Sequence, residues 1–305
     1  MKREISNISA SIQAKLQNKA HESGRPFNEI LQYYGMERFL YRLSKTPHVN
    51  DLILKGGLMF YGLEIPMRRT TRDIDFLGVS ENSQQDILSV FRDALSVSFP
   101  EDGVLFDANS LQFSPTQVDA NQGGVRITFV GNLGKMRLPI QVDVGFSDEL
   151  ASEVLNMEYP VLLPDMEKLR LKGYPPESII SEKFYAMIRF ADANSRWKDY
   201  YDIYLLTETF EFDSYSVANA IRSTFGNRPA ELKNQIPYGL RESFAAAKQQ
   251  EWETFLRKSK LSNDSIQDLS VVVNRIWEFL ECPLREIQIG EHLTGKRWLR
   301  GSGWR

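Results

Sequence analysis

The sequence reads Leu52-Ile-Leu-Lys-Gly-Gly57 and, a short distance later, Arg72-Asp-Ile-Asp-Phe76. The first stretch has the apolar residues of a buried strand, and its glycine pair predicts a tight turn before a helix that begins at Leu58. Such a turn lets backbone N–H groups approach a phosphate at a helix N-terminus. We therefore expect a phosphate-binding turn at Gly56 and Gly57, although a glycine pair is more often only a turn.

Asp73 and Asp75 lie two positions apart in a second expected strand, so both carboxylates leave the same face. Aspartate is depleted in strands, which indicates that something other than strand propensity favours the pair. Two aspartates at a strand end are usually solvated. Because these two closely follow the glycine turn, the combination is more specific, and it predicts a site for a divalent cation.

A third carboxylate, Asp143, occurs in an otherwise apolar strand that we expect over Leu138–Val144. It lies on the face opposite Ile140, Val142 and Val144. If this strand pairs beside the first two aspartates, Asp143 completes an oxygen-rich site of the kind that Mg²⁺ prefers. The alternative is an aspartate on an edge strand that faces water.

Composition sets the broad class of the protein. With 305 residues and 42% hydrophobic content, one large or two ordinary domains are expected. No apolar run reaches transmembrane length, the start of the chain lacks the apolar segment of a secretory signal, and Cys282 is the single cysteine. These features predict a cytoplasmic protein with no membrane partner.

The charge pattern is uneven, because residues 1–50 carry eight Lys and Arg against four Asp and Glu, and residues 285–305 carry five against two. Attraction to a polyanion such as RNA fits this pattern, and solvated surface charge fits it almost as well. Hydrolases with Ser-His-Asp or Cys-His sites and zinc sites are poorly supported. The three histidines and the cysteine lie far from the motifs above: His21, His48, His292 and Cys282.

Hydrophobic periodicity predicts helices first, then a mixed region, then helices again. Residues 1–48 read as a helical cap in which Arg38 and Arg42 are surface or ion-paired arginines, with a lesser chance of a role in substrate binding. A helix over 84–97 precedes expected strands over 104–106 with 111–113, 125–130 and 138–144. Composition changes near residue 150, and beyond Glu177 the chain is almost wholly helical.

Two charges interrupt the apolar faces of the later helices. Lys183 emerges from the apolar stripe of a helix that starts at Glu177, and Asp199 lies on the apolar face of the next one. They could form a structural ion pair. Otherwise they line a cleft, where the lysine binds a polyphosphate and the aspartate positions that lysine or a nucleotide hydroxyl, with Asp202 a weaker candidate.

Four blocks together resemble the AbiEii-type nucleotidyltransferase toxins, a family that includes the MenT toxins. The blocks are Leu54-Lys-Gly-Gly57, Arg69-Thr-Thr-Arg-Asp-Ile-Asp-Phe76, Glu182-Lys-Phe-Tyr-Ala186 with Arg189, and Lys198-Asp-Tyr-Tyr-Asp-Ile-Tyr204. The resemblance covers roughly residues 5–210 and implies an α+β fold: a polymerase-β-like mixed sheet flanked by helices, then a helical C-terminal domain. We expect the helical cap over 1–48, the nucleotidyltransferase core over 49–160 and, over 161–305, a helical domain that completes the active-site cleft.

The resemblance also implies roles for individual residues. Lys55, Gly56, Gly57 and Lys183 would bind the nucleotide, whereas Lys183 and Asp199 would act in the active site. The metal ligands and catalytic carboxylates would be Asp73 and Asp75, with Asp143 added from the strand pattern. Many relatives carry a hydroxyl residue after the first glycine or at the position of Leu58. This chain has Gly57 and Leu58 there, so its phosphate contacts must rely on backbone N–H groups.

The activity implied is a Mg²⁺-dependent transfer, with Mn²⁺ as an alternative, of a nucleoside monophosphate from a nucleoside triphosphate to RNA, with the tRNA 3′ end as the leading acceptor. In-line attack on the α-phosphorus would release pyrophosphate, and Asp143 is the best candidate to take the acceptor proton. Toxicity in the absence of an antitoxin protein is expected. A protein nucleotidyltransferase, a phosphotransferase and a non-enzymatic nucleotide-binding module remain alternatives.

The tail offers a further hypothesis. Trp298 and Trp304 lie among basic residues and could stack on single-stranded RNA ends, or they could pack against the last helix.

Overall fold

The computed structural model describes residues 7–65, 69–78, 84–119, 122–146, 154–191, 195–226, 232, 235–261, 266–290 and 295–305. Within these residues the chain forms two compact units, the first ending at Tyr174 and the second starting at Pro175. The sequence predicts an α+β fold with helices in the C-terminal part, and this prediction is confirmed. The functional division into cap, core and cleft-completing domain stays a prediction.

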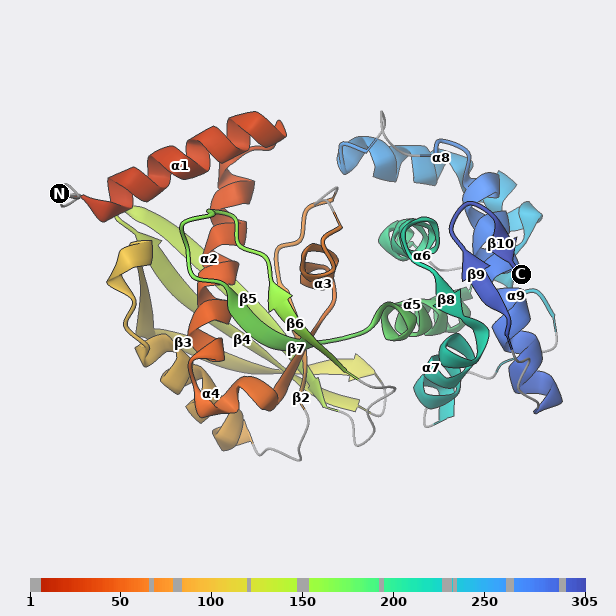
Figure 1. Cartoon of the computed structure of the whole chain (residues 1–305), viewed down its shortest axis with the longest axis horizontal. Coiled ribbons are helices and arrows are strands. Elements are labelled where there is room, and N and C mark those ends of the chain that lie inside the picture. The colour runs from red at the N-terminus through yellow and green to blue at the C-terminus, as the bar shows by residue number, and fades with distance from the viewer. Residues whose placement is uncertain are drawn as a thin grey trace. The chain divides into compact units, whose positions relative to one another are not determined.

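The first unit is built on a seven-stranded mixed sheet (Figure 1). Its order is β3-β4-β5-β2-β1-β7-β6, and the pairs β2–β5 and β1–β7 are parallel while the other pairs are antiparallel. The strands are β1 (Leu52–Lys55), β2 (Ile74–Gly78), β3 (Val104–Asp119), β4 (Gln122–Leu133), β5 (Met136–Phe146), β6 (Leu155–Tyr159) and β7 (Leu169–Gly173).

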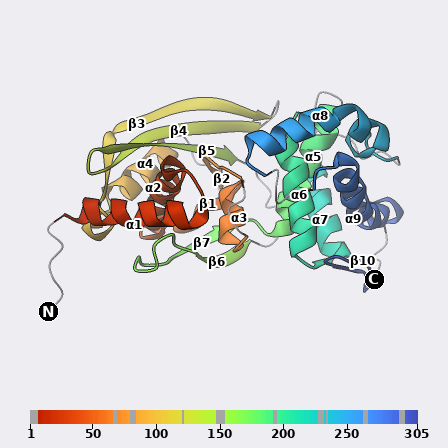
Figure 2. The same ribbon diagram turned by 90° about the horizontal axis from the view of Figure 1, so that it is seen from above.

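Two strands resolve points that the sequence left open. The runs 104–106 and 111–113 belong to one long strand, β3, which lies beside β4 in Figure 2. β3 pairs with β4 on either side of an irregularity in register. β5 lies between β4 and β2, so the interpretation of Asp143 as an edge-strand aspartate is wrong. Which strands lie side by side depends on how the whole sheet assembles, so the local residue pattern did not reveal the neighbours of β5.

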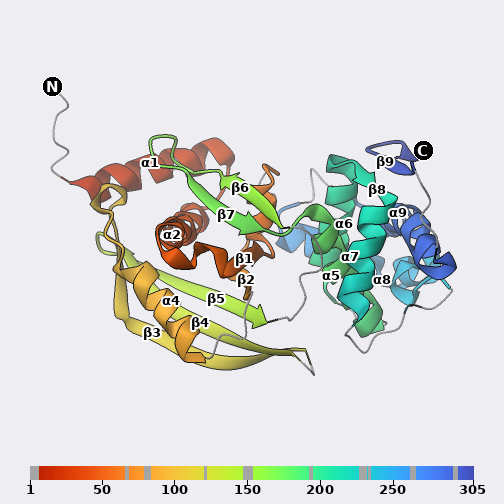
Figure 3. The same cartoon turned by 60° about the horizontal axis from the view of Figure 1, so that its bottom comes forward.

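Helices cover the sheet of the first unit. They are α1 (Ile8–Ser23), α2 (Phe27–Ser44), α3 (Leu58–Gly62) and α4 (Gln84–Ser96). In Figure 3, α2 lies within the curve of the sheet, and it packs against β5 and β7, while α4 packs against β3 and α2. Gly35 lets α2 approach β5 closely, since an added Cβ would lie 3.3 Å from the side chains of Leu138 and Ile140. An aromatic cluster fills the space beneath, with the ring of Phe39 4.8 Å from that of Phe129.

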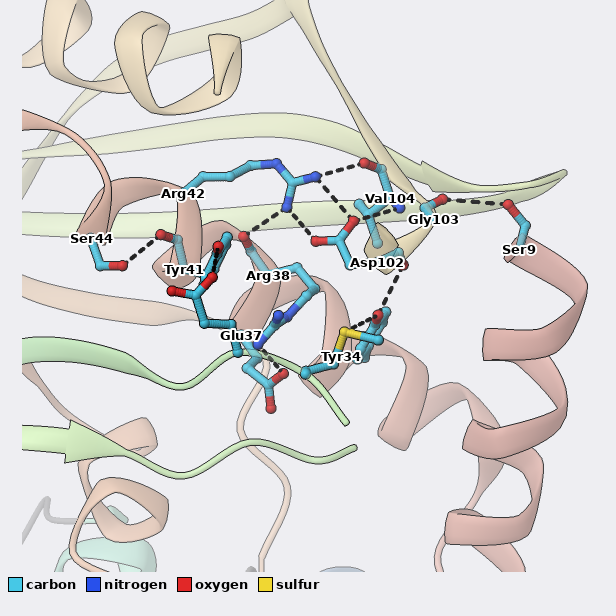
Figure 4. Close-up of polar contacts among 12 residues, drawn as sticks. Ser9, Tyr34, Glu37, Arg38, Tyr41, Arg42, Ser44, Asp102, Gly103 and Val104 are labelled. Atoms are coloured by element: carbon cyan, nitrogen blue, oxygen red, sulfur yellow. Dashed lines mark hydrogen bonds and ion pairs between the residues drawn. The ribbon is translucent and has the colours of Figure 1, made fainter. Parts of the chain in front are cut away.

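Arg38 and Arg42 are buried, so their interpretation as surface arginines is wrong and the ion-paired alternative is confirmed (Figure 4). Nη1 and Nη2 of Arg42 donate to the carboxylate of Asp102 at 2.6 and 3.1 Å. Nη2 of Arg38 lies 2.7 Å from Oε1 of Glu37. Burial raises the pKa of Glu37 to about 7, although Arg38 and the N–H of Leu162 favour its charged form. These pairs tie α2 to the chain before β3 and to residue 162.

The second unit is helical with one small sheet. Its helices are α5 (Pro176–Phe190), α6 (Trp197–Thr209), α7 (Ser214–Gly226), α8 (Glu242–Lys258) and α9 (Leu269–Ile289). Its strands are β8 (Phe212–Asp213), β9 (Arg297–Leu299) and β10 (Gly303–Trp304). α5 packs against α6 and α7, and α9 packs against α6, α7 and α8. Among the described residues, no helix combines the length and apolar composition that crossing a membrane requires.

Both tryptophans of the tail pack against other residues of the second unit. Trp298 is fully buried, and its indole N–H donates to the carbonyl of Thr207 at 2.8 Å. The ring of Trp304 stacks on Phe279 of α9 with centroids 5.5 Å apart. The packing alternative for the tail is therefore confirmed.

Candidate metal and nucleotide site

Four charged residues lie in one row across four neighbouring strands of the first unit. Arg126 on β4 is the register partner of Asp143 on β5, Asp143 is the partner of Asp75 on β2, and Asp75 is the partner of Lys55 on β1. Because register partners point to the same face of a sheet, the two aspartates lie side by side with one cationic residue beyond each of them.

The third aspartate joins this row from the residue before β2. One carboxylate oxygen each of Asp73, Asp75 and Asp143 lies within 4.8 Å of the other two, and all three residues are half-buried. Carboxylate oxygens at such spacing are ligands that hard divalent cations prefer, and partial burial leaves further coordination positions for water or phosphate. The three carboxylates that the sequence singles out come together and fit a divalent cation.

Arg126 contacts this group directly through Asp143. Its Nε donates to Oδ1 of Asp143 at 2.8 Å, and its Nη2 donates to Oδ2 at 2.9 Å, while Gln141 donates to the same Oδ2 at 3.3 Å. The hydrogen bonds to Asp143 and the charges of the three aspartates raise the pKa of the Arg126 guanidinium. Sequence reasoning missed Arg126. It is a polar position in an expected strand, and only the register of the sheet reveals its partner.

The glycine turn lies directly against the carboxylates. Gly56 has φ +68°, and a Cβ added there would lie 1.9 Å from Oδ2 of Asp75. A Cβ added at Gly57 would lie 2.2 Å from Oγ1 of Thr71. Both glycines are thus required by close approach, and the first also by its left-handed backbone. The helix that follows, α3, is only five residues long, so phosphate binding here rests on the turn's N–H groups more than on a helix dipole.

The segment before Asp73 is held by α2. The buried N–H of Thr71 donates to the hydroxyl of Tyr33 at 3.2 Å, and the hydroxyl of Thr70 donates to Glu29 at 2.7 Å. Glu29 in turn pairs with Arg25. Burial raises the pKa of Tyr33, which keeps it a neutral hydroxyl. None of these supports stood out in the sequence, because they join segments about forty residues apart.

The second unit holds a cluster of charges around Lys183. Nζ of Lys183 lies 2.9 Å from Oδ1 of Asp199 and 2.8 Å from Oδ2 of Asp202, and Nε of Arg196 donates to Oδ2 of Asp199 at 2.6 Å. Burial alone would raise the pKa of Asp199, but the charges of Lys183 and Arg196 outweigh it and lower the pKa to about 2. The ion pair of Lys183 with Asp199, one of the two alternatives that the sequence left open, is present, and it includes Asp202. Their role toward a nucleotide stays a prediction.

The family model described as "Nucleotidyl transferase AbiEii toxin, Type IV TA system" matches residues 38–281. No curated protein sequence matches the chain. Two solved structures from Helicobacter pylori are similar to it: JHP933, and a protein proposed to be a nucleotidyltransferase. Each is 14% identical over 87% of this chain with a TM-score of 0.47, and the match covers 94% and 98% of the respective chains.

Proposed function

This chain belongs to the AbiEii family of nucleotidyl transferase toxins of type IV toxin–antitoxin systems, and from that premise we propose that it transfers a nucleoside monophosphate from a nucleoside triphosphate to the 3′ end of a tRNA. The observation that supports the proposal most is the convergence of Asp73, Asp75 and Asp143 beside the turn at Gly56. A site of this kind places metal-binding oxygens next to backbone N–H groups that can contact a phosphate.

The three aspartates would hold Mg²⁺, with Mn²⁺ as an alternative. When bound, the cation would neutralise charge on the phosphates and polarise the acceptor hydroxyl. Lys55 and the N–H groups of the glycine turn would bind the phosphates from the protein side.

The acceptor oxygen would form a bond to the α-phosphorus as the bond from that phosphorus to the bridging oxygen breaks, which releases pyrophosphate. The acceptor proton would pass to Asp143. Lys183 would neutralise phosphate charge, and Asp199, which is ionised because its pKa is low, would orient Lys183.

The family supports the proposed partner protein, whereas the tRNA acceptor is part of the proposal itself. A toxin of a toxin–antitoxin system implies an antitoxin protein. We place the reaction in the cytoplasm, where tRNA and nucleoside triphosphates occur together.

The proposal is tested by incubating the protein with Mg²⁺, each α-labelled nucleoside triphosphate in turn and total cellular RNA, followed by a denaturing gel. We expect label in a band of tRNA size, lost without metal and lost in Asp75→Ala. Asp93→Ala serves as the matched control, because Asp93 is an exposed aspartate of α4 outside the triad. Full activity of a folded Asp75→Ala variant would contradict the proposal.

The same assay separates the alternatives when a γ-labelled triphosphate and a nucleotide-binding measurement are added. Label on protein would indicate a protein nucleotidyltransferase. Transfer of a γ-label but not of an α-label would indicate a phosphotransferase. No transfer with any triphosphate, together with nucleotide binding, would indicate a nucleotide-binding module.

A further inference from the structure

The guanidinium of Arg126 contacts Asp143, a carboxylate that a metal ion would need as a ligand. Both oxygens of Asp143 accept hydrogen bonds from the guanidinium, at 2.8 and 2.9 Å. Such a two-pronged pair is the strongest geometry that arginine offers to a carboxylate. A divalent cation that uses Asp143 must therefore share or displace at least one of these bonds.

We propose that Arg126 competes with the divalent cation for Asp143, so that the site binds metal weakly by itself and binds it well only together with the triphosphate. Arg126 is then a positioning residue that sets the order of binding. This inference rests on the proposed function, because it assumes that the three aspartates are the metal ligands.

The charges in the row support this order. Three carboxylates carry three negative charges, and Arg126 and Lys55, which are register neighbours of two of them, carry two positive charges. One net negative charge attracts a divalent cation only weakly. Sites for such cations usually offer several carboxylates or phosphate oxygens. A triphosphate supplies the missing negative charge at the moment when catalysis needs the metal.

The position of Arg126 is compatible with such a change of partner. Its side chain is 44% exposed, and that of Asp143 is 22% exposed. Water can therefore solvate the guanidinium if it releases one oxygen, and a pair this exposed contributes little to folding stability. Replacing Arg126 should change metal binding while the fold is kept.

The test measures Mn²⁺ binding without nucleotide, from the electron paramagnetic resonance signal of the free ion. We expect Arg126→Gln to bind Mn²⁺ about tenfold more tightly than the unchanged chain, because one positive charge and one competing donor are removed. Arg126→Lys, which keeps the charge but cannot form the two-pronged pair, should fall between them. The matched control is Arg137→Gln, which removes the charge of an exposed arginine elsewhere on β5.

Two comparisons make the result specific. In an Asp143→Asn background, Arg126→Gln should tighten Mn²⁺ binding less than it does in the unchanged chain. With the triphosphate present, the difference in Mn²⁺ affinity between the unchanged chain and Arg126→Gln should shrink. Both outcomes follow from competition at Asp143, and a purely structural role of Arg126 produces neither.

Unchanged or weaker Mn²⁺ binding by Arg126→Gln would overturn the inference. If Asp75→Ala then still abolished Mn²⁺ binding, the proposed metal site would stand and only the inference would fail. If neither the unchanged chain nor Arg126→Gln bound Mn²⁺, with or without triphosphate, both would fail.

Discussion

Asp75 and Asp143 are register partners in the parallel strands β2 and β5, although the strands β3 and β4 lie between them in the sequence. Their partnership turns two isolated aspartates into one acidic site, which Asp73 completes.

Gly56→Ala should abolish most of the transfer activity. The new Cβ would collide with Asp75, and a displacement of about 1 Å at a reacting site costs about 100-fold in rate. Gly24→Ala separates the collision from backbone strain, because Gly24 has nearly the same φ, +65°, with no atom within 4 Å of an added Cβ. It should lower the free energy of unfolding by about 1–2 kcal/mol and leave transfer intact. Equal activity losses in the two variants would show that the contact with Asp75 is unimportant.

Tyr33→Phe should lower both stability and the rate of transfer. The buried N–H of Thr71 loses its acceptor, which costs about 1–3 kcal/mol, and the segment that leads to Asp73 loses its support from α2. Urea denaturation and the labelled-nucleotide assay measure the two effects. Tyr41→Phe is the control, since its hydroxyl donates to Glu167 and should affect stability alone. A Tyr33→Phe variant with unchanged turnover would argue against a positioning role of α2.

Asp199→Asn should remove a pH-dependent part of the stability. The folded pKa of Asp199 is about 2, below its usual 3.8, so its ionised form stabilises the fold above pH 3.8, and this contribution is lost as the pH falls through about 2. The difference corresponds to about 2 kcal/mol. The gap in unfolding free energy between the unchanged chain and Asp199→Asn should therefore narrow between about pH 4 and pH 2. If the difference in unfolding free energy between the two proteins stayed constant over this range, the lowered pKa of Asp199 would be contradicted.

Trp298→Ala should destabilise the second unit by about 3–5 kcal/mol, because a fully buried indole and its hydrogen bond to Thr207 are removed. Arg300→Ala changes an exposed residue of the same tail and should alter stability by less than about 0.5 kcal/mol. Thermal unfolding followed by circular dichroism measures both. An unchanged melting temperature in Trp298→Ala would show that the buried indole contributes little to the stability of the second unit.

The local pattern of the sequence was enough for much of the fold. The apolar run of β1, the alternation of β5 and the periodicity of α4 and α5 each depend on side chains within a few residues of one another, so these elements were predicted close to their observed bounds. The glycine turn and the aspartates at 73 and 75 were found in the same way, because their unusual residue types stand next to each other in the chain.

The tertiary structure alone decided which of these elements meet. The register of β2, β4 and β5 puts Arg126 on Asp143 and Asp143 beside Asp75, and a shift of one residue would have turned these side chains to opposite faces. The burial of Arg38 could not be predicted either, because the residue pattern of a helix does not show which strands will pack against it. Residue types and local spacing are properties of neighbouring positions, whereas register and burial depend on partners that are distant in the chain.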